Sequence, residues 1–143
     1  MSVTGAPQSL TIPAKPGALS AVTEFLRKGA IEANLPEARI GELDLLIDEL
    51  ITNVCIHAYP AGMSGQVTVT YIVPAPGELS VEVADQGPEF NPLNNDPPDL
   101  TLSLEDRPIG GLGIYLVKAF ATSLSYRREQ GWNRLTFGMS AGS

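Results

Sequence analysis

The chain of 143 residues is 43% apolar, which is enough for one packed domain. Nine lysines and arginines stand against 16 aspartates and glutamates, and the net charge of −7 disfavours direct binding of nucleic acid, which needs a basic surface to displace counterions. The one cysteine, Cys55, excludes an intramolecular disulfide and a metal site built from thiolates. No charged leader precedes an apolar run and no stretch approaches the roughly 18 apolar residues of a membrane span, so we expect a cytoplasmic protein that binds no membrane.

The first half of the chain is expected to form one strand and two helices. A short strand over residues 10–13 precedes a Pro/Gly turn, and apolar residues at helical spacing then predict a helix over 18–33. A longer helix is expected from residue 36 to about residue 57, because Pro36 suits the first turn of a helix. Its apolar stripe includes Ile40, Leu43, Ile47, Leu50 and Val54.

The next part of the chain predicts a hairpin and then a long segment without a period. Alternation of apolar and polar residues indicates strands over 67–73 and 79–85, joined by a turn at 74–77. Residues 87–108 are rich in Pro, Asn, Asp and Leu, and a segment of this length inside a compact domain is usually a lid or a binding loop.

The last part predicts one helix, over 114–122, and two strands, over 124–127 and 133–139, with a turn at 129–131. Strands outnumber the crossovers that a parallel sheet needs. The order of elements therefore favours an α+β fold, a two-layer sandwich in which a mixed, mostly antiparallel sheet carries the helices on one face. We expect a single domain over residues 8–139, with frayed termini on either side.

Glu49 and Asn53 are four residues apart in the second helix and hence lie one above the other, with His57 continuing the line. Such a pair is often only the polar face of an amphipathic helix. Alternatively, it places a base beside an oxygen ligand for a hard cation such as Mg²⁺, which needs few protein oxygens when a nucleotide supplies others. His57 is more simply interpreted as a packing or helix-end residue.

Asp85 ends a strand, and Gly87 follows two positions later. A carboxylate in this place can accept hydrogen bonds from the exocyclic amine and the ring of adenine. Glycine would let a planar base lie close to the backbone.

Gly110, Gly111, Leu112 and Gly113 open the helix expected after the long segment. Glycines at a helix start allow backbone N–H groups to approach an anion, and the positive end of the helix favours phosphate. Glycine clusters also make simple turns, and neither the P-loop nor the dinucleotide-binding fingerprint is present.

Four motifs follow one another along the chain: Glu49-x-x-x-Asn53, Asp85-x-Gly87-x-x-Phe90-x-Pro92, Gly110-Gly111-Leu112-Gly113-Ile114 and Leu135-Thr136-Phe137. In this order they closely resemble the N box, the two glycine boxes and the terminal strand of the GHKL ATPases, the Bergerat-fold superfamily of gyrase, Hsp90, the histidine kinases and MutL. The phrase from Asp48 to Asn53 and the phrase from Arg107 to Gly113 look like the small anti-sigma-factor serine kinases of the RsbW and SpoIIAB type.

The resemblance implies a role for each matching residue. Asn53 would bind Mg²⁺, and Glu49 would act as the general base or orient the attacking group. Asp85 would read the adenine, with Gly87 beneath the base, and Thr136 of the last strand would help to hold it.

The same resemblance assigns the phosphates to Gly110, Gly111, Leu112 and Gly113, and makes residues 88–109 the ATP lid. Pro88 and Glu89 depart from the family pattern, which often has a second glycine before Phe90. On the first helix, where the family often presents an arginine to its partners, both Arg27 and Lys28 qualify.

The activity implied by the resemblance is transfer of the γ-phosphoryl group of ATP, with Mg²⁺, to a serine of an antagonist protein of the STAS type. The protein would also sequester a sigma factor, and it would be a homodimer. Two alternatives remain: a nucleotide-gated binding module without phosphotransfer, and a histidine-kinase ATPase domain acting on a separate phosphoacceptor domain. Retention of both Glu49 and Asn53 favours the serine kinase.

Overall fold

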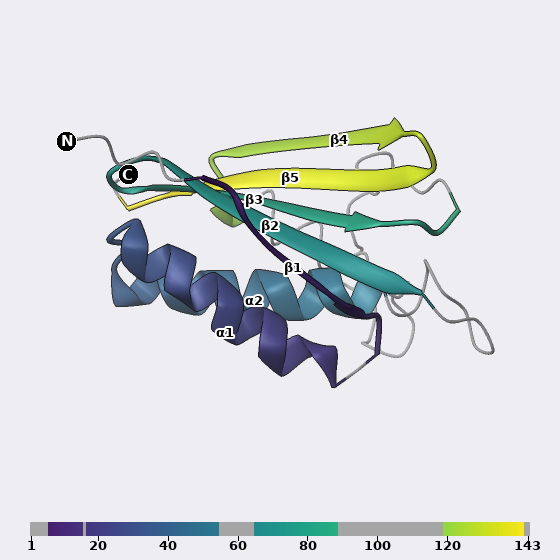
Figure 1. Ribbon diagram of the computed structural model, residues 1–143. Coiled ribbons are helices and arrows are strands. Elements are labelled where there is room, and N and C mark those ends of the chain that lie inside the picture. The colour runs from purple at the N-terminus through teal and green to yellow at the C-terminus, as the bar shows by residue number, and fades with distance from the viewer. Residues whose placement is uncertain (1–5, 16, 55–64, 89–118, 142–143) are drawn as a thin grey trace, which may run out of the picture.

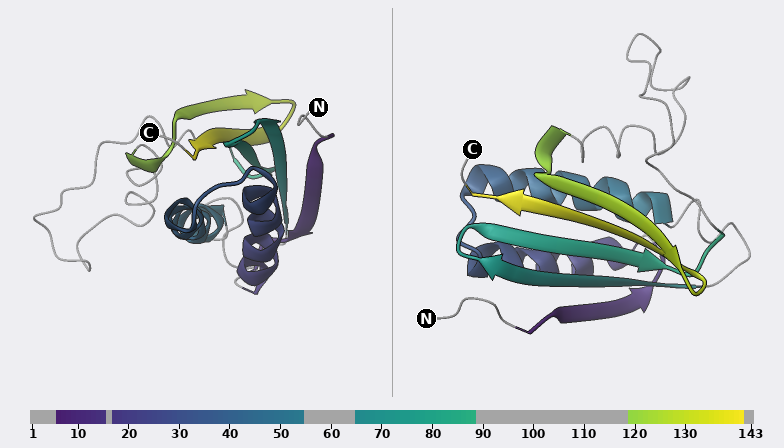
Figure 2. Two further views of the ribbon diagram at one scale, coloured as in Figure 1. Left: turned by 90° about the vertical axis from the view of Figure 1, so that its left-hand side faces the viewer. Right: turned by 90° about the horizontal axis from the view of Figure 1, so that it is seen from above.

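Figure 1 shows the computed structural model of the chain, which describes residues 6–15, 17–54, 65–88 and 119–141. Within these ranges the chain forms two long helices and five strands, and all the strands belong to one sheet. Both helices lie against the same face of the sheet, as the two views of Figure 2 also show. The expected α+β sandwich of two layers is confirmed.

The first helix, α1 (Ala18–Glu32), buries the small or apolar residues Val22, Leu26, Gly29 and Ala30. It ends because Asn34 adopts the left-handed backbone conformation, with φ of 60°. The Asn34 N–H donates to the Ile31 carbonyl and the Leu35 N–H donates to the Ala30 carbonyl, both at 3.0 Å. This is the Schellman arrangement, and the buried Leu35 side chain accompanies it.

The second helix, α2 (Glu37–Asn53), begins one residue later than expected. Pro36 has an extended backbone, with φ of −70° and ψ of 160°, and is therefore the N-cap and not a residue of the first turn. The predicted end of this helix near residue 57 lies outside the described residues.

The strands are β1 (Gln8–Pro13), β2 (Gln66–Ala75), β3 (Glu78–Asp85), β4 (Ser123–Glu129) and β5 (Trp132–Ser140). Their order in the sheet is β1-β2-β3-β5-β4, and each neighbouring pair is antiparallel. β5 therefore lies between β3 and β4, next to the strand that ends in Asp85. The five strands expected from the sequence are all present.

The turn between β2 and β3 is tighter than the four-residue turn predicted at 74–77. β2 continues through Pro74 and Ala75, and residues 76–77 alone form the turn, with Gly77 at φ of 79°. Pro74 is tolerated in a strand because it lies where the register of the β2–β3 ladder shifts, so its missing N–H interrupts no regular pair.

The turn between β4 and β5 is also shorter than predicted, because Glu129 is the last residue of β4. Gln130 and Gly131 form the turn, and both have positive φ, 49° and 85°. Positive φ at both central residues is typical of the type I′ turn, whose twist matches that of a hairpin.

The helix predicted over 114–122 lies mostly outside the described residues. Residues 119–120 are helical, and the helix ends two residues before the end expected at about Thr122. The Thr122 N–H instead donates to the Gly138 carbonyl of β5 at 2.8 Å, so the chain has already joined the sheet at this point.

The core lies between the sheet and the two helices. It is formed by alternate residues of β2, β3 and β5 and by the stripes of α1 and α2, and its largest fully buried side chains include Leu26, Leu43, Leu46, Ile47, Ile51, Val81, Phe137 and Met139. Within the described residues, neither helix combines the length and the apolar character that crossing a lipid bilayer demands.

The candidate nucleotide-binding site

Asp85 and Asn133 face each other at the end of the β3–β5 ladder. They are direct partners in the register, with Val67 of β2 on one side of Asp85 and Arg128 of β4 on the other side of Asn133. Direct partners in an antiparallel pair point to the same face, and the burial of Val67 shows that this face is the one turned toward the helices. Asp85 is 8% exposed and Asn133 is 6% exposed, so a carboxylate and an amide meet here largely out of water.

One oxygen of Asp85 is held by two donors. The Gly87 backbone N–H and the Asn133 Nδ2 group each donate to Asp85 Oδ1 at 2.9 Å. The bond from Gly87 is the local turn that an aspartate makes with the backbone two residues on. Within the described part of the chain no hydrogen bond reaches Asp85 Oδ2, which leaves an acceptor for a donor on a ligand.

Asn133 is itself held on both sides of its amide. Its Oδ1 accepts hydrogen bonds from the Tyr126 hydroxyl at 2.6 Å and from Arg128 Nη1 at 3.1 Å. Its Nδ2 also donates to the Pro88 carbonyl at 2.9 Å. Because donors surround the oxygen and acceptors surround the nitrogen, the amide has one orientation that satisfies all of these partners.

Arg128 ties the β4–β5 hairpin to the turn that follows β3. Its Nη1 donates to the Gly87 carbonyl at 2.7 Å as well as to Asn133. Gly87, which we expected to lie beneath the base, is therefore held by Asp85 at its N–H and by Arg128 at its carbonyl. The structure brings Asp85 and Gly87 together, and their contact with a base stays a prediction.

The sequence motifs do not predict three residues of this site, which are Tyr126, Arg128 and Asn133. The signal for Asn133 is the alternation of β5, because Leu135 and Phe137 are apolar and point inward, and Asn133 shares their parity. No sequence signal singles out the two β4 residues, since their role depends on how β4 pairs with β5.

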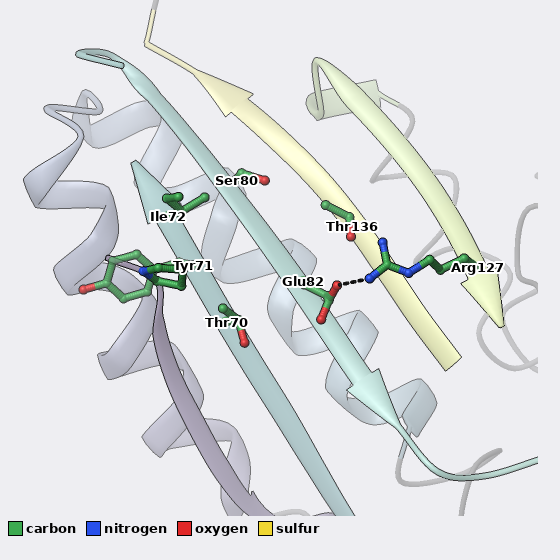
Figure 3. A pocket seen from close by; sticks show the side chains of 8 residues that line it. Thr70, Tyr71, Ile72, Ser80, Glu82, Arg127 and Thr136 are labelled. Carbon is green, nitrogen blue, oxygen red and sulfur yellow. Dashed lines mark ion pairs between the residues drawn. The ribbon is translucent and has the colours of Figure 1, made fainter. Parts of the chain in front are cut away.

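Thr136, which the resemblance assigns to the adenine, lies on the other face of the sheet. Its direct partners are Glu82 and Ser125, and it lines a shallow groove of about 270 Å³ with Thr70, Ser80, Glu82 and Arg127. Figure 3 shows these side chains on the face away from the helices. The structure therefore does not bring Thr136 to Asp85, and the β5 residue beside that carboxylate is Asn133.

Glu49 lies in the second half of α2 and is partly buried. Burial raises the pKa of its carboxyl above the ordinary value, and the negative charge of Asp48 raises the pKa further. A carboxylate with a raised pKa is a stronger proton acceptor, which is the property that a general base needs.

Several predicted site residues lie outside what the structure describes. Asn53 is the last residue of α2, but its side chain is not described, so its role as an Mg²⁺ ligand stays a prediction. The same holds for the phosphate-binding residues Gly110, Gly111, Leu112 and Gly113, and for the lid. Among the described residues no group of three or more His, Cys, Asp or Glu side chains could hold a metal ion.

On α1, Arg27 is held by the neighbouring helix. Its Nη2 and Nε atoms lie 2.8 Å and 3.4 Å from the two carboxylate oxygens of Asp44 on α2, in a largely exposed pair. Of the two basic residues that the sequence offered for a partner, Arg27 therefore has its orientation fixed within the chain.

Comparison with known families assigns the chain to a class of protein. The chain belongs to the histidine kinase-like ATPase domain family, whose sequence model matches residues 12–139. Its curated relatives are named as protein kinases, which confirms the resemblance to the RsbW group. It is 36% identical over 94 residues to the serine/threonine-protein kinase BtrW of Bordetella bronchiseptica, in an alignment that covers 66% of each chain. It is 29% identical over 127 residues to the serine-protein kinase RsbW of Listeria monocytogenes, covering 86% of this chain and 80% of that one.

Solved structures share the fold. The structure of the RsbU and RsbW domains of Rv1364c from Mycobacterium tuberculosis matches with a TM-score of 0.66 and 18% identity, over 95% of this chain and 32% of that chain. The Acinetobacter baumannii histidine kinase AdeS matches with a TM-score of 0.50 and 14% identity, over 94% of this chain and 68% of that chain. At these identities the likeness concerns the fold alone.

Proposed function

We propose that the chain is a protein-serine kinase that transfers the γ-phosphoryl group of ATP to a serine of an antagonist protein of the STAS type. The observation that carries this proposal is the burial of Glu49, which raises the pKa of its carboxyl on the helix that also bears Asn53. A module that only binds nucleotide has no need of such a base. The names of the relatives, serine/threonine-protein kinase and serine-protein kinase, support the same activity.

We place the adenine at Asp85. The carboxylate end that has no hydrogen bond within the described residues would accept the exocyclic amine, and Gly87 would lie against the ring. The chemistry of the two groups is complementary, since a donor on the base meets an acceptor on the protein. We further propose that Gly110, Gly111, Leu112 and Gly113 receive the phosphates, and that Asn53 contributes an oxygen to Mg²⁺.

The chemical step requires little covalent work from the protein. Bound MgATP supplies a phosphoryl group whose charge is partly neutralised. Glu49 would take the proton of the attacking serine hydroxyl as the new bond from that oxygen to the γ-phosphorus forms and the bond to the departing ADP oxygen breaks. Positioning of the serine against the nucleotide provides most of the remaining acceleration.

We extend the proposal to regulation, because the sequence motifs resemble the anti-sigma-factor serine kinases of the RsbW type. The protein would hold a sigma factor until an unphosphorylated antagonist competes for it, and it would act as a homodimer in the cytoplasm, without direct contact to nucleic acid. The unit concerned is the domain over residues 8–139.

The test is incubation of the purified protein with labelled MgATP and separate STAS-type antagonist domains, followed by analysis of the phosphoamino acid. Acid-stable phosphoserine on an antagonist is the expected result. Acid-labile phosphohistidine on a separate domain would replace this proposal by a histidine-kinase function. Binding of ATP without transfer to any candidate, under conditions in which a known kinase of this group is active, would replace it by a nucleotide-gated binding module.

A further inference from the structure

Asn133 of β5 is the feature of the site that neither the sequence motifs nor the comparisons assign to a function. We propose that Asn133 is a positioning residue that fixes the rotation of the Asp85 carboxylate and thereby sets the preference of the site for adenine over guanine. The inference rests on the proposed function, because it takes Asp85 to be the residue that reads the base.

The geometry fixes one oxygen of Asp85 and leaves the other to the ligand. A carboxylate oxygen has two lone pairs, and Asp85 Oδ1 already accepts from the Gly87 N–H and from Asn133 Nδ2, each at 2.9 Å. Rotation of the carboxylate about its last bond would exchange the two oxygens only if both donors were released. The donor from Asn133 therefore keeps Asp85 Oδ2 directed away from the β5 side of the pair.

The rigidity of this arrangement comes from β4. The Tyr126 hydroxyl and Arg128 Nη1 hold Asn133 Oδ1 at 2.6 Å and 3.1 Å, so the amide cannot turn its oxygen toward Asp85 without losing both. A turned amide would also set its oxygen against a carboxylate oxygen in a buried place. The contacts within the β4–β5 hairpin thus keep the Asn133 amide nitrogen, and not its oxygen, directed at Asp85.

This orientation has a consequence for the base. An ionised carboxylate oxygen only accepts hydrogen bonds, so it favours the amino group at position 6 of adenine over the carbonyl oxygen that guanine carries there. A carboxylate that shares a proton with a neighbouring acceptor can donate as well as accept and so adapt to either group, and a donor at Asn133 gives Asp85 no such proton to share. Sites that leave a buried polar group unpaired with the wrong ligand discriminate strongly, and discrimination is therefore the property that Asn133 controls.

The variant that tests this is Asn133→Asp, which has nearly the same size. It keeps an oxygen for Tyr126 and Arg128 but replaces the donor toward Asp85 by an acceptor. Tyr126→Phe, which removes one of the two donors that hold the amide, is a milder second variant. Titration calorimetry with MgATP and with MgGTP gives the ratio of the two dissociation constants, and thermal unfolding without nucleotide reports whether each variant is folded.

We expect the ATP-over-GTP ratio to fall about tenfold or more in Asn133→Asp and by a smaller factor in Tyr126→Phe. Thr70→Val is the matched control, because it also removes one side-chain hydrogen bond of the sheet, to Ser9 at 2.9 Å, but on the face away from the helices. Its ratio should equal that of the unchanged chain.

A folded Asn133→Asp variant whose ratio stays within about twofold of the unchanged chain would overturn the inference and leave the proposed function intact. If Asn133→Asp does not fold, Tyr126→Phe decides in the same way. An unchanged chain that binds no ATP would instead overturn the proposed function, and the inference with it.

Discussion

Gly29 of α1 lies directly under the ring of Tyr71 of β2, so closely that a Cβ atom at Gly29 would stand 2.7 Å from the ring. The Tyr71 ring also contacts Phe25, with centroids 5.1 Å apart, and its hydroxyl donates to Glu32 at 3.3 Å. The aromatic ring is therefore held from three sides, and it sets how closely α1 can approach the sheet.

Gly29→Ala is accordingly expected to destabilise the protein by about 1–3 kcal/mol, because overpacking outweighs the gain of about 1 kcal/mol that alanine brings to a helix interior. Gly41→Ala in α2 is the matched control, since a Cβ there would meet no atom within 4 Å. It should stabilise the protein by up to about 1 kcal/mol. Urea denaturation measures both, and a stabilising Gly29→Ala would contradict the packing described for Tyr71.

Asp85→Asn is expected to weaken ATP binding about 10- to 100-fold. The amide oxygen would stay with the two donors at Gly87 and Asn133, so an NH2 donor would replace the charged acceptor that receives the adenine amine. Titration calorimetry gives the affinity. Glu78→Gln, at the exposed start of the same strand, controls for the loss of one negative charge from a protein of net charge −7. Equal affinities for the two variants would remove Asp85 from the nucleotide site.

Thr136→Val is expected to change ATP affinity by less than about twofold, because the side chain points to the outer face of the sheet and its neighbours there are Glu82 and Ser125. The same titration measures it. A loss comparable to that of Asp85→Asn would instead support the role that the resemblance implies for Thr136.

Glu49→Gln is expected to lower phosphotransfer by about 10²- to 10⁴-fold, the usual contribution of a general base, and to leave ATP affinity nearly unchanged. Single-turnover transfer to an antagonist domain measures the effect. In the unchanged chain the rate should fall toward acid pH, with a midpoint above the ordinary pKa range of glutamate, because burial raises the pKa of Glu49. Transfer at near full rate in Glu49→Gln would show that another group accepts the proton.

The raised pKa of Glu49 also predicts how stability depends on pH. The folded state favours the protonated Glu49 carboxyl. The protein therefore has its full stability below the unfolded pKa of about 4.3 and loses part of it as the pH rises through the higher folded pKa. Glu49→Gln, which cannot ionise, should therefore gain in stability relative to the unchanged chain between pH 4 and pH 7. Urea midpoints at the two pH values measure this. Glu24→Gln on the exposed side of α1 controls for the lost charge, and an equal gain there would contradict the assignment to burial.

Most of the fold follows from periodicity in the sequence. Alternation located β2, β3 and β5, and helical spacing located α1 and α2, because each of these elements turns one row of side chains into the same core. The ends of elements were less predictable. Pro74 and Glu129 belong to strands and not to turns, since strand ends depend on pairing with a neighbour that local composition does not reveal.

The site was predictable where a motif is local and was not where it depends on pairing. Asp85 and Gly87 are two residues apart and form one turn, so their association could be seen in the sequence. The resemblance assigns Thr136 to the adenine by its residue type within a motif, although the inward parity of Leu135 and Phe137 places it on the outer face. The contacts of Arg128 and Tyr126 with Asn133 arise only once the β4–β5 register is known.

Asp85 and Asn133 belong to two different hairpins and lie 48 residues apart in the chain. The β2–β3 and β4–β5 hairpins each close through a short turn and can form early, whereas the β3–β5 ladder must bring distant segments together against the entropy of the intervening chain. The seam between the hairpins, like the β1–β2 ladder, thus joins segments that lie far apart in the chain. A nucleotide bound at Asp85 would stabilise that seam by mass action. Its binding should therefore slow the exchange of amide hydrogens in the β3–β5 ladder more than in the β1–β2 ladder. The ligand would then add to the stability of the folded sheet.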